Sequence, residues 1–257
     1  MTAPDGGLGD ILYWAAPAAA VADAAGSAEG LAAFLSAQER ESQLRFRRAE
    51  DRLDYAASHA LFRLVAAWQL GLEPGAAAGL AIRRRCSGCG STEHGKPSID
   101  GAELSLSRSH GTVMVAAGPD GRPLGVDIEK IPAEIFAGFD EYAVAESELP
   151  DPHGPGFTDG DRIRLWVAKE AILKASGLGL ALEPSAVQLV PVDASAAGVM
   201  AGRGLGPWRA ASPGHPSVDG MLAYAVPAPG GYAAAVAARD GLPGRTMPLR
   251  TVFALDA

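Results

Sequence analysis

The order of strand-like and helix-like segments limits the fold of this chain more than any other feature of its sequence. Short strand-like segments are interspersed with helical ones, but the regular strand–helix–strand rhythm of a doubly wound parallel sheet is missing. The sequence therefore predicts an α+β fold. The predicted strands are residues 11–14, 104–106, 112–117, 124–129, 187–192, 222–226 and 232–238.

Two segments carry the strongest helical signals. Residues 36–70 form the longer one, and its apolar residues recur at helical spacing, which predicts one buried face. Residues 162–176 form the other, and the pair Gly177 and Gly179 ends it. A third helical piece is predicted around residues 135–149, whereas residues 83–97 and 150–161 are predicted to be loops. The apolar face of the long helix consists of Leu53, Ala57, Ala60, Leu61, Leu64 and Ala67.

The turn Pro119-Asp120-Gly121-Arg122-Pro123 is the best boundary between two halves of the chain. It predicts an N-terminal α+β subdomain at 1–122 and a C-terminal one at 123–257. Each half has a strand of small residues near its end, at 113–117 and 233–238. This repetition hints at an internal duplication.

Charge and cysteine content narrow the functional classes. The net charge of −8 and the pI of about 5.1 disfavour broad electrostatic binding of nucleic acid. Two cysteines cannot build a disulfide framework. The apolar run at residues 11–22 is short and broken by Pro17, so neither a secretory signal nor a membrane span is predicted. We therefore expect a cytoplasmic protein.

Lysine is rare in this chain, because 18 of the 22 basic residues are arginine. A lysine ammonium is a compact charge that suits phosphate oxygens. Arginines gather at residues 45–52 and 83–85, where solvated surface is an equally good interpretation. Each lysine falls in or beside a motif described below: Lys96, Lys130, Lys169 and Lys174.

The segment Gly125-Val126-Asp127-Ile128-Glu129 carries two carboxylates on one face of a predicted strand. Carboxylate oxygens in such a pair suit a hard divalent cation such as Mg²⁺. Taken by itself, the segment fits a solvated acidic edge strand better.

Three further segments supply groups for binding phosphate. Trp166, Glu170 and Lys174 follow one another at i, i+4 and i+8 on a helical stripe, although an ordinary Glu–Lys surface pair also fits the charges. Gly95-Lys96-Pro97 places a lysine after a flexible glycine. Ser105-Leu106-Ser107-Arg108-Ser109-His110-Gly111 offers hydroxyls, a guanidinium and an imidazole, and suits a phosphate-binding turn or a plain polar turn equally well.

The order and spacing of these motifs resemble the 4′-phosphopantetheinyl transferase superfamily, in its larger, surfactin-synthetase-activating type. The resemblance runs from about residue 36 to residue 238. It implies a pseudo-dimer of two similar α+β subdomains, with the active site in the cleft between them. It implies a Mg²⁺ site, or alternatively a Mn²⁺ site, formed by Asp127, Glu129 and Glu170. Coenzyme A is implied to contact Gly95, Lys96, Pro97, Ser107, Arg108, Asp127, Glu170 and Lys174.

Two departures from the family pattern stand out. The family usually has Ser-His at the turn, whereas this chain has Ser107-Arg108, with His110 two places further on. Arginine can bind phosphate but cannot be a neutral acceptor near neutral pH. Basic residues often precede the Arg-Phe pair in the family, and here Glu39 and Ser42 stand there. The contact with the 3′-phosphate is therefore expected from Arg45, Arg48 or Arg52.

The resemblance implies transfer of the 4′-phosphopantetheine group of coenzyme A to a serine of an acyl, polyketide or peptidyl carrier protein, with release of 3′,5′-ADP. Asp127, Glu170 and Lys174 are the expected catalytic residues, and Glu170 acts as the base or only as a ligand. The alternatives are a coenzyme A pyrophosphate hydrolase and a non-catalytic module that binds coenzyme A or a carrier. A monomer is expected, since two fused halves already form a cleft.

Two segments remain outside this scheme. Cys86 and Cys89 with His94 give three of the four ligands that zinc needs, and His110 or His153 are candidates for the fourth. A tight turn that carries two thiols is the preferred interpretation. Residues 131–149 include several large apolar side chains, which suit either a carrier-docking surface or an ordinary core helix.

Overall fold

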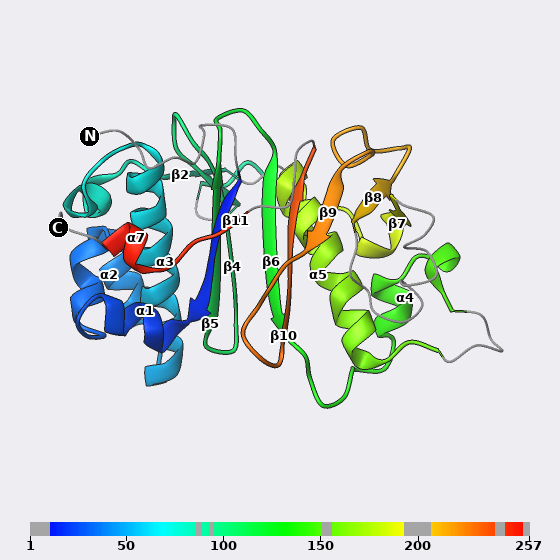
Figure 1. Cartoon of the computed structure of the whole chain (residues 1–257), viewed down its shortest axis with the longest axis horizontal. Coiled ribbons are helices and arrows are strands. Elements are labelled where there is room, and N and C mark those ends of the chain that lie inside the picture. The colour runs from blue at the N-terminus through cyan, green and yellow to red at the C-terminus, as the bar shows by residue number, and fades with distance from the viewer. Residues whose placement is uncertain are drawn as a thin grey trace.

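Two sheets stacked face to face, with helices on both outer sides, form this protein (Figure 1). The computed structural model describes residues 11–85, 89–92, 95–150, 156–192, 207–239 and 245–253. The first sheet has the order β11 (Arg245–Thr246), β1 (Leu12–Pro17), β5 (Thr112–Gly118), β4 (Glu103–Ser109). The second has the order β6 (Leu124–Lys130), β10 (Tyr232–Ala238), β9 (Leu222–Ala225), β8 (Trp208–Ala211), β7 (Gln188–Pro191). The predicted α+β class is confirmed.

Helices cover the outer face of each sheet (Figure 1). On the outer side of the first sheet lie α1 (Ala18–Ala24), α3 (Ala49–Gln69) and, near the end of the chain, α7 (Arg250–Phe253), and α2 (Ala37–Leu44) packs on α3. On the second lie α5 (Asp159–Ser176) and the short α4 (Phe139–Ala143). A small hairpin joins β2 (Arg83–Arg85) to β3 (Lys96–Ser98). Short 3₁₀ turns occupy Gly30–Phe34, Pro74–Gly79, Glu146–Glu148, Gly179–Ala181 and Pro184–Ala186.

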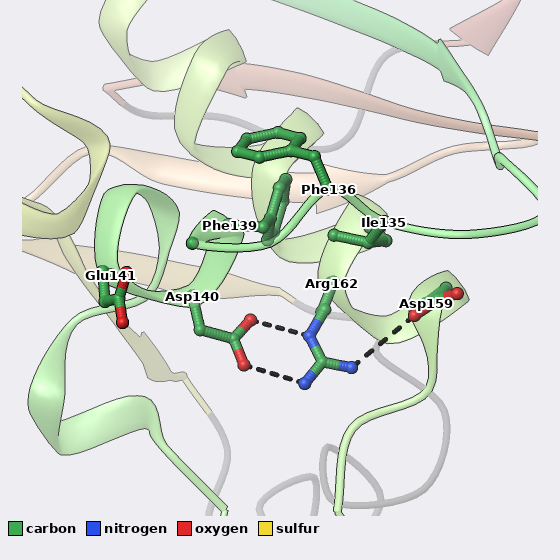
Figure 2. Close-up of a pocket in the computed structure, with 8 residues that line it drawn as sticks. Ile135, Phe136, Phe139, Asp140, Glu141, Asp159 and Arg162 are labelled. Atoms are coloured by element: carbon green, nitrogen blue, oxygen red, sulfur yellow. Dashed lines mark hydrogen bonds and ion pairs between the residues drawn. The ribbon is translucent and has the colours of Figure 1, made fainter.

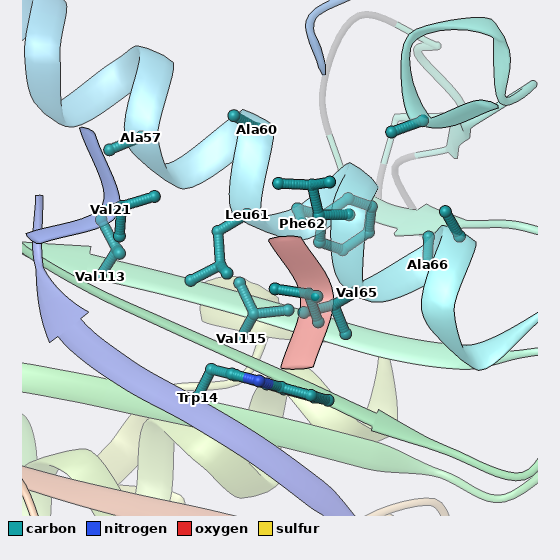
Figure 3. Packing of buried hydrophobic residues seen from close by; sticks show 14 of the residues in the cluster. Trp14, Val21, Ala57, Ala60, Leu61, Phe62, Val65, Ala66, Val113 and Val115 are labelled. Atoms are coloured by element: carbon teal, nitrogen blue, oxygen red, sulfur yellow. The ribbon is translucent and has the colours of Figure 1, made fainter. Parts of the chain in front are cut away.

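Alternation along the strands produces three apolar layers. In β5, Val113 and Val115 face α3, whereas Met114 and Ala116 face the second sheet. Figure 3 shows Trp14 of β1 on the same side as Val115, under the apolar face of α3. The third layer lies between the second sheet and α5. Burial of these apolar surfaces is the main favourable contribution to folding.

The predicted helical region 36–70 is two helices in the structure. α2 begins at a capping box, in which the Ser36 hydroxyl accepts from the Glu39 N–H and the Glu39 carboxylate accepts from the Ser36 N–H. The chain then breaks before α3, because Arg48 is extended (φ −88°, ψ 143°). The predicted apolar face of α3 is confirmed, since all six of its residues belong to or pack against the first core, which is the apolar layer between α3 and the first sheet.

Three other predictions differ in detail from the structure. The segment 83–97, predicted as a loop, contributes strands at both ends. The helical piece predicted at 135–149 contains only α4 and one 3₁₀ turn, because Gly138 has a left-handed backbone (φ 88°) just before α4. α5 begins at Asp159, three residues before its predicted start, and β8 was not predicted.

The end of the described chain returns to the first half. β11 pairs in parallel with β1, and Val252 of α7 is buried in the first core. The indole N–H of Trp14 donates to the Thr251 hydroxyl (3.1 Å). The division at 122/123 and the pseudo-dimer remain predictions. No helix among the described residues is both long enough and apolar enough to cross a membrane.

Candidate active site

Strand β6 places two acidic side chains on the face that the sequence predicted. Val126 and Ile128 are buried between the sheets, so Asp127 and Glu129 project from the opposite face. The Asp127 side chain is only 3% exposed, and Glu129 is half-buried. A buried carboxylate is costly unless other groups compensate its charge.

Three alternate serines of β4 join this strand to β6. Each side chain bonds to a different point of β6, so that hydroxyls link the edges of the two sheets. Only Ser107 of the three was predicted to contact coenzyme A, and the period of two predicts no more than that the three serines share one face of the strand. The bonds are Val126 N–H to Ser105 Oγ (3.0 Å), Ser107 Oγ to Asp127 Oδ1 (2.7 Å), Ser109 Oγ to Glu129 Oε2 (2.5 Å) and Lys130 N–H to Ser109 Oγ (3.2 Å).

Helix α5 brings the other two predicted groups to the same place. A capping box at Thr158 starts the helix, and Gly177, with left-handed backbone (φ 75°), ends it. Lys174 Nζ donates to Asp127 Oδ1 (2.6 Å) and to Ser107 Oγ (3.0 Å). A residue from each of three elements therefore meets at one point.

Close approach of α5 to β6 depends on Gly125. A Cβ atom at this position would lie 1.9 Å from the Ala171 carbonyl oxygen and 2.5 Å from the Ala175 nitrogen, both of them backbone atoms. The helix can approach the strand only because this side chain is absent. The distance from Asp127 and Glu129 of β6 to Glu170 of α5 depends on this contact.

Gly125→Ala should therefore destabilise the fold by about 1–3 kcal/mol, the usual cost of an overpacked core. It should also lower activity, because α5 must move away from Asp127. Urea denaturation and an activity assay check both effects. Gly214→Ala is the matched control, because a Cβ there meets nothing within 4 Å. Equal behaviour of the two variants would contradict the role of Gly125.

The carboxylates influence one another electrostatically. Burial raises the pKa of Glu170 to about 7, which the Lys174 charge opposes and the charges of Asp127 and Glu129 reinforce. Burial also raises the pKa of Glu129. The charge of Asp127 raises this pKa further, whereas the hydrogen bond from Ser109 lowers it. The three acidic side chains thus lie close enough to share one field, although they come from β6 and α5.

The donor chemistry of this cluster suits a hard cation. Among the described residues, Asp127 Oδ2 and Glu170 Oε1 are the buried side-chain oxygens that have no hydrogen-bond partner. Oxygens of this kind are the ligands that Mg²⁺ prefers. As the side chains stand, no three His, Cys, Asp or Glu residues in the described part of the chain could hold a metal ion together. Binding a cation at this cluster would therefore require these side chains to rearrange.

The Gly95-Lys96-Pro97 segment lies at the start of β6. Lys96 Nζ pairs with Glu103 and donates to the Leu124 carbonyl (2.9 Å), so this lysine joins β3, β4 and β6. The Gly95 carbonyl accepts from Arg84 (3.2 Å), a residue of β2. The predicted phosphate contacts of Gly95, Lys96 and Pro97 stay a prediction.

A group of basic and aromatic side chains lies where the turn between β4 and β5 meets the start of α3. The Gly111 N–H donates to Asp54 Oδ2 (2.9 Å), which ties the turn to the helix. The Arg108 guanidinium lies 5.5 Å from the ring centre of Tyr55 and 5.9 Å from that of Phe46. The other predicted phosphate ligands of this region are Arg45 and Arg48, which are exposed, and Arg52, which is half-buried.

Glu39 occupies a place where the family often has a basic residue, and the structure gives it a different role. Its carboxylate accepts from Arg63 Nε (2.5 Å) and lies 3.2 Å from His59 Nδ1. Burial would raise the pKa of Glu39, but the hydrogen bonds from His59 and Arg63 outweigh it and lower the pKa to about 2. Glu39 thus neutralises a buried arginine.

His110 has a left-handed backbone (φ 44°), which is uncommon for a residue other than glycine. Its ring nitrogen Nδ1 lies 2.9 Å from Ser109 Oγ, and its carbonyl accepts from the Tyr232 hydroxyl (2.6 Å). The turn is therefore fixed from two sides, with the imidazole one hydroxyl away from Glu129. Cys86, His94 and His153 lie outside the described residues, so the zinc site also stays a prediction.

The segment after β6 forms a surface pocket of about 320 Å³ (Figure 2). Arg162 of α5 makes a two-pronged bond to Asp140 of α4, at 2.6 and 2.8 Å. Phe139 is buried against α5, whereas Phe136 is 63% exposed. Phe139 thus belongs to the core, whereas a carrier-docking role for residues 131–149 stays a prediction.

Two sequence matches relate this chain to known proteins. The sequence pattern of the 4′-phosphopantetheinyl transferase superfamily matches residues 123–236, which include Asp127, Glu129, Glu170 and Lys174. The chain is also 31% identical over 165 residues to a 4′-phosphopantetheinyl transferase of Bacillus subtilis, covering 62% of this chain and 67% of that protein. From the matched sequence and the site that it contains, we conclude that this chain belongs to the 4′-phosphopantetheinyl transferase superfamily.

Proposed function

We propose that this enzyme moves the 4′-phosphopantetheine group of coenzyme A onto a serine of an acyl, polyketide or peptidyl carrier protein, in a magnesium-dependent reaction that releases 3′,5′-ADP. One observation carries the proposal. Asp127 and Glu170, from a strand and a helix, each keep one buried oxygen without a partner beside the Lys174 ammonium. Such a site combines cation ligands with a group that binds phosphate.

In the proposed reaction the carrier serine Oγ forms a bond to the β-phosphorus of coenzyme A. The bond from that phosphorus to the bridging oxygen breaks, and the oxygen leaves with 3′,5′-ADP. Glu170, whose pKa is raised to about 7, accepts the serine proton. Lys174 lies beside Asp127 and stabilises charge on the leaving side. A role for Glu170 as a ligand only is the alternative.

Asp127, Glu129 and Glu170 would hold Mg²⁺, or Mn²⁺. The bound cation supplies charge neutralisation at the pyrophosphate. Two observations support this assignment. Besides burial, the charge of Asp127 raises the pKa of both Glu129 and Glu170. Asp127 Oδ2 and Glu170 Oε1 are buried without a hydrogen-bond partner in the residues that the structure describes.

Coenzyme A is an anion, so the acidic chain must bind it through local positive charge. Arg108 and the arginines at the start of α3 provide such a region at the end of β4. Arg45, Arg48 and Arg52 are the proposed ligands of the 3′-phosphate, and Lys96 and Ser107 those of the pyrophosphate. The pocket beside Phe136, which apolar and charged side chains line together, is the proposed place for the carrier protein to dock (Figure 2).

Mass spectrometry of an apo carrier protein, incubated with the enzyme, coenzyme A and Mg²⁺, tests the proposal. A mass gain of one phosphopantetheine group on the carrier, together with release of 3′,5′-ADP, is the expected result. Loss of coenzyme A without carrier modification would favour a pyrophosphate hydrolase instead. If neither changes with any carrier class, a binding role replaces the catalytic one.

A further inference from the structure

Lys169 precedes Glu170 in the sequence, but it lies in the protein interior. Its side chain is 0% exposed, whereas that of Lys174 on the same helix is 29% exposed. A side chain without solvent contact cannot touch coenzyme A or a carrier protein in this arrangement. Lys169 must therefore affect the reaction, if at all, through other residues.

The Lys169 ammonium is bound at two fixed points. Nζ donates to Glu148 Oε2 (2.5 Å) and to the carbonyl of Ala143, the last residue of α4. The second bond is 2.8 Å long. Together they attach the middle of α5 to the segment that follows α4.

Glu148 is itself held rigidly by backbone donors. Oε2 also accepts from the Ala145 N–H (2.7 Å), and Oε1 accepts from the Leu189 N–H of β7 (2.6 Å). The Glu148 side chain is only 6% exposed. One carboxylate therefore joins α5, the 3₁₀ turn after α4 and the edge of the second sheet.

The opposite side of α5 is fixed by its contact with β6. Gly125 allows the backbone of the helix at Ala171 and Ala175 to approach the strand. A helix fixed on two sides, at Lys169 and at residues 171–175, can neither turn about its axis nor slide along it. Glu170 lies between these two attachments.

We infer that Lys169 and Glu148 are positioning residues, whose buried ion pair sets the rotation of α5 and so holds the Glu170 carboxylate beside Asp127. A buried ion pair is weak support for stability, because apolar residues of similar volume often replace one without loss. Fixing a register is the best-attested use of such a pair. The inference rests on the proposed role of Glu170.

Two further residues of α5, Trp166 and Arg162, hold the surface beside Phe136 through contacts with α4. Trp166, one turn before Glu170, packs on Phe139 and Tyr142 with ring centres 5.9 and 5.8 Å away. Figure 2 shows Arg162, a further turn back, paired with Asp140. Arg162 and Trp166 thus hold α4, and Glu170 and Lys174, further along the same stripe of α5, lie near the carboxylates of β6.

The test compares the full chain with three variants in steady-state carrier modification. Lys169→Met removes one charge, and Lys169→Met with Glu148→Gln removes both while keeping an acceptor for one of the two backbone donors. Leu64→Ala, in the first core, is a control that loses stability away from the site. Each protein is assayed at the same interval below its own melting temperature.

Lys169→Met should lower kcat at least about tenfold and leave the KM for coenzyme A within about twofold, since a small misplacement of a reacting group is costly. The double variant should regain melting temperature but not kcat, and Leu64→Ala should keep its kcat. A double variant with the kcat of the parent enzyme would overturn the inference, even if Lys169→Met fails to fold.

Glu170→Gln, run in parallel, separates failure of the positioning role from failure of the proposed role of Glu170. If Glu170→Gln is inactive while the double variant is fully active, only the positioning role is lost. Near-normal kcat in Glu170→Gln overturns the role of Glu170 and the inference with it.

Discussion

Asp127→Ala should lower the kcat of carrier modification by at least about 10²-fold, the usual cost of losing one preorganised electrostatic group. Asp127 contributes both an oxygen that binds Lys174 and Ser107 and a buried oxygen without a partner. Alanine removes both oxygens, so Lys174 loses the group that positions it. Mass spectrometry of the carrier under single-turnover conditions measures the effect, and circular dichroism confirms that the variant is folded.

Two comparisons sharpen this result. Asp127→Asn keeps a hydrogen-bond acceptor for Lys174 but has no charge. If Asp127→Asn loses as much activity as Asp127→Ala, the loss is due to the missing charge. Glu129→Ala should be milder than either, because Glu129 is half-buried and water can replace it as a cation ligand. If both Asp127→Ala and Glu170→Gln modified the carrier at a near-normal rate, the active site could not lie at this cluster.

Alternation within one strand made the carboxylates of β6 predictable. The residues of the Gly125–Glu129 segment follow period two, and the structure places Val126 and Ile128 in the core and Asp127 on the other face, as expected. Spacing within one helix likewise predicted that Glu170 and Lys174 share a side of α5. Local periodicity is enough for both, because each depends only on the geometry of its own element.

Contacts between distant elements could not be predicted in this way. The serines of β4 bond to β6 only because the two sheets meet along these strands, which no pattern inside β4 reveals. Lys169 illustrates the same limit. Its place in the motif suggests a charge that suits phosphate oxygens, whereas tertiary packing places it in the interior with Glu148, 21 residues away.

Short or irregular elements were missed for a related reason. β8 has the sequence Trp-Arg-Ala-Ala, too short to show an alternation, and it exists because β7 and β9 pair on both sides of it. The strands β2 and β3 have three residues each and were hidden in a segment rich in glycine and serine. Tertiary pairing overrides weak local preference in such cases.

The site also has a stability cost that activity measurements do not reveal. A functional cluster often keeps groups that local rules disfavour, and the rest of the fold compensates for them. Glu170 is such a group, since its pKa of about 7 means that burial opposes its charged form. Replacing it by an uncharged residue should therefore stabilise the protein while it removes activity.

Glu170→Gln is expected to raise the unfolding free energy of the metal-free protein at about pH 8 by up to about 3 kcal/mol. The sign follows from the direction of the pKa change. The folded state holds the Glu170 proton more tightly than the unfolded state does, because the pKa rises from 4.5 to about 7 on folding. Stability of the parent protein must then fall as the pH rises through this range. Glutamine does not titrate, so the variant escapes this loss.

Urea denaturation in the presence of a chelator, from about pH 5 to about pH 8, measures the difference. This range excludes Glu39, whose pKa is lowered to about 2 and whose contribution is lost only in more acidic solution. Glu146→Gln, at an exposed position, is the matched control for losing one negative charge. The gain for Glu170→Gln should fall below about 1 kcal/mol near pH 5, because the unfolded pKa is 4.5. Mg²⁺ should stabilise the parent protein more than the variant, since a ligand stabilises only the state that binds it. A gain that is the same at every pH would mean that Glu170 is not buried in the field of Asp127 and Glu129, and the proposed cation site would lose its main support.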